Sequence, residues 1–469
     1  MNSTEMVAFI ENRTYDEIKI GESAVLVRTL RPEDIQLYAI MSGDVNPTHV
    51  DPEYARSSMY REVVAHGMWG AALISTVLGT QFPGPGTVYV DQTLHFARPV
   101  TVGDTITVTV TCRKKFDHNH HIVFDCLCLN QDGLKVIAGT AEVQAPSEKI
   151  KRTRVAMPEF KISDKQARYD HVLSICKDLA AIPMSVAHPC DSESLKGALM
   201  ARDAGLILPV LVGPEEKIRQ LADEFNLSLD GCTIINTPHS HASAEVAVQL
   251  ARDGEVDAVM KGSLHTDELM GAVIDKTLGL RTARRISHVF LMDVPTYPRP
   301  LMITDAAINI EPDLEVKVDI VQNAVDLAHM LGLVEPKVAI LAAVETVNPK
   351  MRATLDAAAL CKMADRGQIK GALLDGPLAF DNAVSIVAAK TKGIRSAVAG
   401  QADILVVPDI ESGNMLAKQL EYLADAVSAG IVLGTRVPIV LTSRADSAET
   451  RTASCAIAVV MAHARRKPV

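Results

Sequence analysis

The stretch SGDVNPTHVDPEYARSSMYREVVAHGM, residues 42–68, decides the fold of the first part of the chain. Asp44 and His49 lie five residues apart in it, with Asn46 and Pro47 between them. Proline lacks an N–H and biases the preceding residue towards extended geometry, so the segment is predicted to be a turn rather than a helix. A turn can aim a carboxylate and an imidazole at one point, as acid–base chemistry on a shared water molecule requires.

The end of the same stretch predicts the start of a helix. The sequence HGM runs into the apolar segment WGAALISTVLG. An unhindered Gly67 amide beside a helix start can donate a hydrogen bond to an oxyanion. A purely structural interpretation stays open, in which Asp44 and Asn46 only cap the turn and His49 is a surface histidine.

The complete string G-D-x-N-P-x-H-x-D, followed by H-G-M, resembles the MaoC-like (R)-specific enoyl-CoA hydratases. The resemblance implies that Asp44 and His49 hold the water molecule that adds to a 2-enoyl thioester. It also implies a residue that braces the loop, an amide that binds the carbonyl and a serine near the catalytic histidine, which are Asn46, Gly67 and Ser75.

Residues 15–145, over which this resemblance extends, contain alternating segments that predict strands. AVLVRTL precedes the motif, and TVYVDQTLHF, DTITVTVTCRKKF, HIVFDCLCLN and VIAGTAEVQA follow the helix. One central helix followed by antiparallel strands is the order of an α+β hot-dog domain. Such a sheet has an exposed edge, which predicts pairing with a second copy of the chain.

The composition of the chain limits its class. Its 469 residues predict two or three domains, and a hydrophobic content of 48% is enough for large cores. The net charge of −10 argues against a nucleic-acid partner. No apolar run reaches the ~18 residues of a membrane-spanning helix, and the polar, acidic N-terminus does not predict a signal peptide. The eight cysteines form no C-x-x-C pair, so we expect a reduced protein in the cytoplasm.

Two groups of residues invite a metal interpretation. Cys126 and Cys128 stand in a strand-like run, where we expect them to face opposite sides rather than to bind zinc. His118, His120 and His121 lie in a predicted hairpin turn, where a solvated loop is the competing interpretation. We therefore expect no metal site in the chain.

The sequence pattern changes after residue 147. Residues 1–147 are predicted to form the hot-dog domain, and residues 148–165 are charged, contain prolines and lack apolar periodicity, as a linker does. Over residues 166–469, strand-like and helix-like segments alternate, which predicts an α/β domain with a mostly parallel sheet. Ligands bind at the carboxyl ends of strands in such folds, so the strand exits hold the candidate site residues.

One strand exit reads VMKGSLHT. Its glycine lets the backbone approach an anion, and the next helix begins with free amides and a positive dipole end. The lysine adds a positive charge. The candidate residues here are Lys261, Ser263, His265 and Thr266, and an ordinary strand–helix turn is the structural alternative.

Later strand exits add further polar residues. PLMITDAAINIEPD supplies Asp305 and Asn309, and PDIESGN supplies Asn414. IVLTSRADSAETR places Ser443 and Arg444 at a strand end, where the arginine can bind an oxyanion through two hydrogen bonds. Taken alone, the serine is also explained as a helix cap.

Six segments occur in the order found in the phosphate acetyl/butyryltransferases, namely VMKGSLHT, RRISHVFLMDVP, ITDAAINIEPD, DGPLAFDNAV, PDIESGN and LTSRADSAE. This resemblance covers roughly residues 165–469. It implies that Ser443, Arg444 and an upstream arginine, for which we choose Arg285, stabilise the carbonyl oxygen and the phosphate. Without the resemblance, Arg285 would be interpreted as one member of a surface cluster of arginines.

The general base of that family does not carry over directly. Acetyltransferases place an aspartate six residues after the arginine of the Ser-Arg pair, and Thr450 stands there in this chain. Asp446 and Glu449 are the two acidic substitutes nearby, and the sequence leaves the choice between them open.

The resemblance also implies an architecture. We expect a two-lobed α/β phosphotransacylase domain like that of the isocitrate/isopropylmalate dehydrogenases. Residues 166–300 and 430–469 are expected to form lobe 1, and residues 301–429 lobe 2. Both the hot-dog domain and this domain are expected to contribute to a homo-oligomer.

Together, the two resemblances imply a bifunctional acyl-CoA enzyme with no bound cofactor, whose substrates are coenzyme A thioesters and inorganic phosphate. The first domain would hydrate 2-enoyl-CoA to (R)-3-hydroxyacyl-CoA, and the second would transfer an acyl group between CoA and phosphate. The alternative is that one half is catalytically inactive and senses acyl-CoA, which Thr450 favours for the second domain. The absence of G-x-G-x-x-G and of a metal-binding aspartate trio disfavours a dehydrogenase. The choice between acetyl and butyryl groups stays open.

Overall fold

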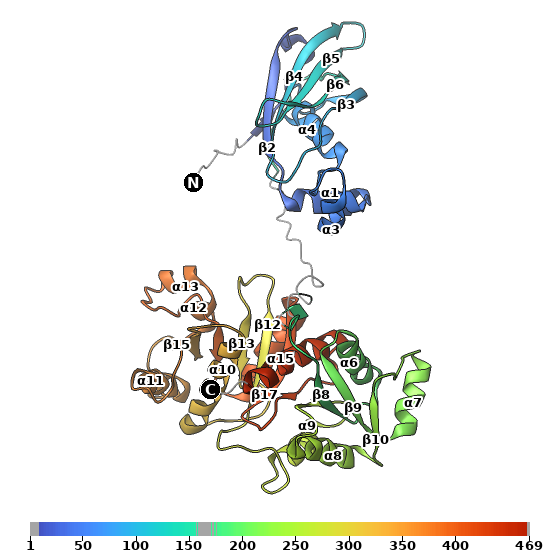
Figure 1. The fold of residues 1–469 in the computed structure, drawn as a ribbon. Helices are drawn as coiled ribbons and strands as arrows, with labels where there is room; N and C mark the ends of the chain where they lie inside the picture. The colour runs from blue at the N-terminus through green and yellow to red at the C-terminus, as the bar shows by residue number, and fades with distance from the viewer. Residues whose placement is uncertain (1–8, 156, 158–169, 171–172, 175, 467–469) are drawn as a thin grey trace. The chain divides into compact units, whose positions relative to one another are not determined.

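The computed structural model describes residues 9–155, 157, 170, 173–174 and 176–466. The chain divides into two compact units, Met1–Ile162 and Ser163–Val469. Each unit is described by itself (Figure 1).

Unit 1 is a five-stranded antiparallel sheet wrapped around one central helix (Figure 1). The sheet has the order β2-β4-β5-β6-β3, and helix α4 packs against β4, β2 and β3. The buried face of α4 includes Trp69, Ile74 and Val77, and each such side chain contributes about 1.5–3 kcal/mol when removed from water. The elements are α4 (Gly67–Thr80), β2 (Ser23–Thr29), β3 (Val88–Phe96), β4 (Thr105–Phe116), β5 (His121–Leu129) and β6 (Lys135–Gln144). The predicted hot-dog fold is therefore confirmed.

The motif segment lies between short helices rather than in one open turn. Helix α1 (Pro32–Ser42) ends at Gly43, whose φ of 75° is left-handed and suits glycine. Asp44 follows in a loop, and His49 lies in the one-turn helix α2 (Pro47–Val50). The prediction of a turn was wrong for His49, which is helical. Pro47 can begin the helix because the first helical residue has no intrahelical partner for its N–H, so the missing N–H of proline costs no hydrogen bond.

Two helix caps, with three hydrogen bonds between them, fix the path of this segment. The Asn46 side chain accepts a hydrogen bond from the Thr48 amide at 3.1 Å and so caps α2. Asp51 accepts from the amides of Glu53 and Tyr54 and so caps the next helix, α3 (Pro52–Ser57). The expected bracing role of Asn46 thus has a concrete local contact.

The first and last strands described in unit 1 form a second, two-stranded sheet. Strand β1 (Phe9–Glu11) pairs antiparallel with β7 (Lys151–Thr153), just before the 3₁₀ turn η1 (Tyr15–Glu17). The Asn12 side chain bonds to the backbone of Glu148 and Ile150. The segment predicted to be a linker therefore belongs to unit 1 as far as Thr153, and most of its remainder lies outside the described residues.

The expectation for the two strand cysteines was wrong. Cys126 and Cys128 are both buried in the core of unit 1, because residues two apart in a strand point to the same face. Burial raises the pKa of the Cys126 thiol to about 12 and that of Cys128 to about 11. Both thiols therefore behave as apolar core groups.

Unit 2 is an α/β unit built on one eleven-stranded sheet of order β10-β9-β8-β11-β18-β17-β12-β13-β16-β14-β15. Two groups of parallel strands, β10-β9-β8-β11-β18 and β13-β16-β14-β15, flank the antiparallel strands β17 and β12. The strands are β8 (Ile182–Ala187), β9 (Ile207–Gly213), β10 (Thr233–Asn236), β11 (Ala258–Lys261), β12 (Ser287–Asp293), β13 (Leu301–Thr304), β14 (Lys337–Leu341), β15 (Leu373–Leu378), β16 (Ile404–Val406), β17 (Val427–Leu433) and β18 (Ile439–Val440).

Helices cover this sheet, and residues 451–462 of the last helix are all buried. Helix α15 packs on β17 and on α6. The last helix of the unit therefore lies beside a helix from its beginning (Figure 1). The helices are α6 (Ser192–Asp203), α7 (Glu215–Glu224), α8 (Ser240–Asp253), α9 (Thr266–Ile274), α10 (Leu314–Met330), α11 (Arg352–Asp365), α12 (Phe380–Val384), α13 (Ile386–Thr391), α14 (Ile410–Leu423) and α15 (Ala448–Arg466). The boundaries of the two lobes and their dehydrogenase-like architecture stay predictions.

Among the helices of the described residues, none combines the length and the hydropathy that a membrane crossing needs.

Candidate active sites

A cavity of about 610 Å³ in unit 1 brings together three of the predicted site residues, Asn46, His49 and Gly67. Apolar side chains form much of the rest of its wall, including Phe96 from β3 and Ile137 from β6. A cavity with apolar walls and a few convergent polar groups is the usual form of a small-molecule site.

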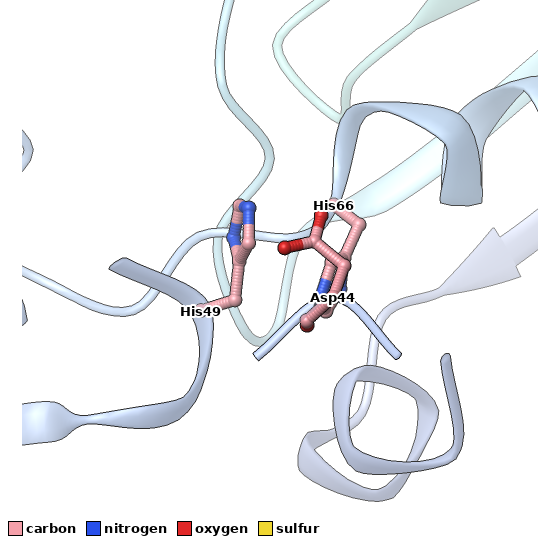
Figure 2. Close-up of side chains that lie close together, drawn as sticks. All are labelled: Asp44, His49 and His66. Atoms are coloured by element: carbon pink, nitrogen blue, oxygen red, sulfur yellow. Dashed lines mark hydrogen bonds between the residues drawn. The ribbon is translucent and has the colours of Figure 1, made fainter. Parts of the chain in front are cut away.

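Asp44 and His49 meet at the polar side of this region, and His66 joins them (Figure 2). One carboxylate oxygen of Asp44 and one ring nitrogen of each histidine all lie within 4.8 Å of one another. Asp44 is exposed, His49 is half-buried and His66 is buried. The carboxylate and the imidazole can thus contact one water molecule, as the motif predicts.

Hydrogen bonds fix the tautomers of the two histidines. His49 Nδ1 lies 2.8 Å from the Val64 carbonyl oxygen, so Nδ1 carries the proton and Nε2 keeps its lone pair. His66 Nε2 lies 2.9 Å from the Asp44 carbonyl oxygen and donates to it in the same way. The free Nε2 of His49 is the nitrogen that can accept a proton.

Gly67 is the first residue of α4, where backbone amides lack helical partners. A Cβ at this position would lie in ordinary contact with the Phe96 ring at 3.4 Å, so the ring in the cavity wall lies directly beside Gly67. Ser75 lies two turns further along α4 and is exposed. The described hydrogen bond of the His49 ring goes to Val64, so the structure does not pair Ser75 with His49.

A second cavity, of about 740 Å³, lies in unit 2 and holds three predicted residues, Thr266, Asn414 and Ser443. Thr266 begins α9, just after the N-cap residue His265, and Asn414 is the fifth residue of α14. Ser443 follows the exit of β18. Three residues predicted from strand exits thus line one cavity, and their role in binding stays a prediction.

Arg285, Asn309 and Asp305 form a separate network near this cavity. Arg285 Nε donates to Asn309 Oδ1 at 3.4 Å, and the Asn309 amide donates to Asp305 at 3.1 Å. Burial raises the pKa of Asp305 above its ordinary value. The three residues do not line the cavity, although Ala306 and Ala307 do.

Lys261 lies buried at the exit of β11, with only 2% of its surface exposed. Burial, together with the nearby Arg451 and Arg444, lowers the pKa of its ammonium group to about 8. Arg451 is also buried and donates to the Lys261 carbonyl at 3.2 Å and to the Ser443 carbonyl at 2.9 Å. Ser263 bonds to Asp191, whose carboxylate lies within electrostatic reach of both cations.

We expect Lys261→Met to stabilise the fold. The wild-type ammonium group has its pKa lowered from 10.5 to about 8, which costs about 3 kcal/mol while the group is charged. This cost is present below pH 8 and disappears as the pH rises from about 8 to 10.5. Chemical denaturation should therefore show a more stable variant at pH 7 and a narrowing difference above pH 8. The exposed Lys362→Met is the control, and equal stability of wild type and Lys261→Met at pH 7 would contradict the expectation.

The two candidate bases differ in surroundings. Asp446 is buried and accepts hydrogen bonds from the Ser443 amide at 2.7 Å and from Lys418 Nζ at 3.1 Å. Burial lowers the pKa of Lys418, but hydrogen bonds to Glu421 and Asp446 outweigh it and raise the pKa. Glu449 is exposed in the first turn of α15. Asp446 thus holds the backbone of the Ser-Arg pair in place.

The sequence interpretation missed His288 and Lys418, which both line the cavity of unit 2. Burial lowers the pKa of His288 to about 4, so its ring is neutral at pH 7. Its Nδ1 is buried without a hydrogen-bond partner. A histidine inside the apolar run of β12 was the available signal, since polar groups in such runs need a partner or a ligand.

Comparisons with known proteins identify both units. The family described as "MaoC like domain" matches residues 17–125, and "Phosphate acetyl/butaryl transferase" matches residues 240–459. The phosphate acetyltransferase of Rhizobium meliloti is 60% identical over 300 residues, which cover 64% of this chain and 95% of that protein. The chain therefore belongs to the phosphate acetyl/butyryltransferase family, joined to a MaoC-like domain.

Two solved structures align with parts of this chain. A branched-chain phosphotransacylase from Enterococcus faecalis is 31% identical, with a TM-score of 0.54, and the match covers 60% of this chain and 99% of that one. An unliganded R-hydratase from Pseudomonas aeruginosa is 37% identical, with a TM-score of 0.32, over 33% of this chain and 99% of that one. The two family matches confirm the predicted fusion of a MaoC-like domain with a phosphate acetyl/butyryltransferase domain.

Proposed function

We propose that the chain is a bifunctional acyl-CoA enzyme. Unit 1 hydrates 2-enoyl-CoA to (R)-3-hydroxyacyl-CoA, and unit 2 transfers an acyl group between CoA and phosphate. The observation that carries the first activity is the convergence of Asp44 and His49 beside the free Gly67 amide. The second rests on family membership and on the polar residues gathered around Ser443.

Hydration would proceed on a water molecule held between the Asp44 carboxylate and His49 Nε2. The Gly67 amide polarises the thioester carbonyl, so that C3 becomes electrophilic and negative charge gathers on the carbonyl oxygen. The water oxygen bonds to C3 while the acid–base pair takes one water proton, and a proton is delivered to C2. The apolar walls around Phe96 and Ile137 accept the acyl chain.

Acyl transfer would be a direct displacement. A phosphate oxygen attacks the thioester carbonyl, the oxyanion forms beside Ser443 and Arg444, and the CoA thiolate leaves. Lys261 and Arg285 add positive charge for the phosphate and the CoA anion, and Asp446 or Glu449 acts as base on the thiol in the reverse direction. Acetyl is the acyl group we propose first, because the relative at 60% identity is named a phosphate acetyltransferase.

A regulatory role of one half is the second candidate. Thr450 in place of an aspartate favours it for unit 2, which would then bind acyl-CoA without turnover. Assays of the purified chain with acetyl-CoA, butyryl-CoA and crotonyl-CoA, with and without phosphate, test both candidates. Phosphate-dependent CoA release supports the transferase, and its absence with every acyl-CoA supports the regulatory role. We further propose a cytoplasmic homo-oligomer, whose size exclusion volume can be measured on the same sample.

We expect the two units to fold and act separately. Each is a compact unit with its own core and its own set of site residues. A fragment of residues 1–155 should hydrate crotonyl-CoA, and one of residues 163–469 should release CoA when phosphate is added. Turnover is compared with that of the intact chain at equal site concentration. Recovery of activity only on mixing the fragments would mean that the units share a site.

A matched fragment tests the role of the short second sheet. Ending the first fragment at Ala145 removes β7 and the backbone partners of Asn12. We expect this shorter fragment to melt at a lower temperature than residues 1–155, because β1 then loses its partner strand.

A further inference from the structure

His66 is the member of the trio in unit 1 that the proposed hydration does not use. Only 3% of its surface is exposed, and its Nδ1 is buried with no hydrogen-bond partner. Nε2 donates to the Asp44 carbonyl, so Nδ1 keeps its lone pair. Buried polar atoms are nearly always satisfied, and a lone pair can be satisfied by a proton donor or by a cation.

Both imidazoles of the trio make the hydrogen bond that is typical of metal-bound histidines. Such histidines almost always donate their second ring N–H to a carbonyl or a carboxylate. His49 donates Nδ1–H to Val64, and His66 donates Nε2–H to Asp44. The two imidazole rings lie next to each other, with centroids 4.1 Å apart. The Tyr38 ring also packs against the His66 ring, at a centroid distance of 4.8 Å. The two free nitrogens are therefore fixed before any ligand arrives.

We propose that Asp44, His49 and His66 form a binding site for one divalent transition-metal ion of borderline softness, with Zn²⁺ as the representative. Two imidazoles and one carboxylate suit zinc and its neighbours, whereas Mg²⁺ and Ca²⁺ prefer oxygen ligands. Three protein ligands leave the fourth tetrahedral position open to solvent. The site was not among the metal candidates that the sequence suggests, because His66 lies 17 residues beyond His49.

The spacing of the ligand atoms is compatible with this geometry. Ligand atoms on a tetrahedral zinc ion lie roughly 3.3 Å apart. One carboxylate oxygen of Asp44 and one ring nitrogen of each histidine lie within 4.8 Å of one another, so the side chains need to close by only roughly 1.5 Å to reach the spacing on zinc. Asp44 is exposed in the loop after α1, and its side chain has room for that movement.

Metal binding at this site inhibits the first activity, and this consequence rests on the proposed hydratase function. The lone pair of His49 Nε2 that accepts the water proton is the one that the ion takes. The Asp44 carboxylate is engaged at the same time. Zinc therefore competes directly with the acid–base pair.

The test measures Zn²⁺ binding to the full chain by calorimetry, and crotonyl-CoA hydration over the same range of Zn²⁺ concentration. His66→Gln keeps an amide donor for the Asp44 carbonyl but removes the imidazole ligand. His118→Ala is the matched control, because His118 is exposed in the β4–β5 hairpin and lies outside the trio. Circular dichroism checks that each variant is folded, and Asp44→Asn, in an exposed loop, serves as the second site variant.

We expect one Zn²⁺ per chain in the wild type and in His118→Ala, and hydration that falls as the ion binds and returns with EDTA. Affinity in His66→Gln and Asp44→Asn should fall about 100-fold or more, since even outer-shell partners of a metal are worth 10- to 100-fold. Unchanged affinity in both site variants, an equal loss in His118→Ala, or no saturable binding in the wild type would overturn the proposal. So would zinc binding that leaves hydration unchanged.

The binding readout separates this inference from the hydratase proposal. Zinc bound through the trio in a chain without hydration activity removes the proposed function and leaves the metal site standing. Hydration without saturable zinc binding removes the metal site and leaves the proposed hydratase function standing.

Discussion

Asp44→Asn and His49→Ala should each lower the rate of crotonyl-CoA hydration by about 10²-fold or more, the scale of acid–base catalysis. The amide of Asn has the shape of the carboxylate but neither its charge nor its basicity. Alanine at position 49 removes the Nε2 lone pair that the Val64 hydrogen bond leaves free. The measurement is steady-state hydration, with phosphate-dependent CoA release recorded on the same samples.

Matched variants in the same unit separate chemistry from stability. Asp132→Asn and His118→Ala change the same residue types in exposed hairpin turns, and we expect wild-type hydration in both. CoA release by unit 2 should be unchanged in all four variants, because unit 2 carries its own site residues. Hydration that survives in both Asp44→Asn and His49→Ala would remove these residues from the mechanism.

The sequence predicted the hot-dog fold well because local patterns decide it. Alternation along β4 and β5 and the apolar run of α4 each encode one buried face, and the structure uses those faces as its core. The small sheet of β1 and β7 escaped prediction for the converse reason. Its strands are three residues long, mostly exposed and separated by 139 residues, so only tertiary contacts define it.

The candidate sites show a similar division. Motif spacing led to Asp44, His49 and Gly67, which the chain brings together within a short segment. His66 was missed, because its burial and its unpartnered nitrogen exist only in the folded chain, whereas His288 left a signal in the apolar run of β12 that was not used. Cys126 and Cys128 show an error of another kind, since the period of a strand already places both on one face.

In unit 2, Arg444→Lys should cause a large fall in acyl transfer, although the charge is retained. Arginine offers a planar fork of donors that can hold two oxygens at once, and lysine offers a point charge. Loss of one oxyanion donor typically costs 10²–10³-fold in rate, so we expect about 10²-fold for Arg444→Lys and more for Arg444→Ala. Phosphate-dependent CoA release from acetyl-CoA measures both.

The surroundings of Arg444 explain why it should be sensitive. It is exposed, but it lies close enough to lower the pKa of the buried Lys261, so both cations can act on one anion. Asp446 accepts a hydrogen bond from the Ser443 amide and another from Lys418, so the backbone just before Arg444 is fixed while the Arg444 side chain is exposed. Arg219→Lys, an exposed arginine paired with Glu215 on α7, is the control and should transfer acyl groups at the wild-type rate.

The two Arg444 variants also decide between the candidate functions of unit 2. If the wild type transfers acyl groups and both variants match it, the Ser-Arg pair is only structural and the oxyanion is bound elsewhere. If the wild type transfers nothing but binds acyl-CoA more tightly than Arg444→Ala does, the same guanidinium serves recognition without turnover. In that case Thr450→Asp restores the aspartate that the acetyltransferases carry six residues after the arginine. A gain of phosphate-dependent CoA release in that variant would then show that the missing base alone had silenced the site.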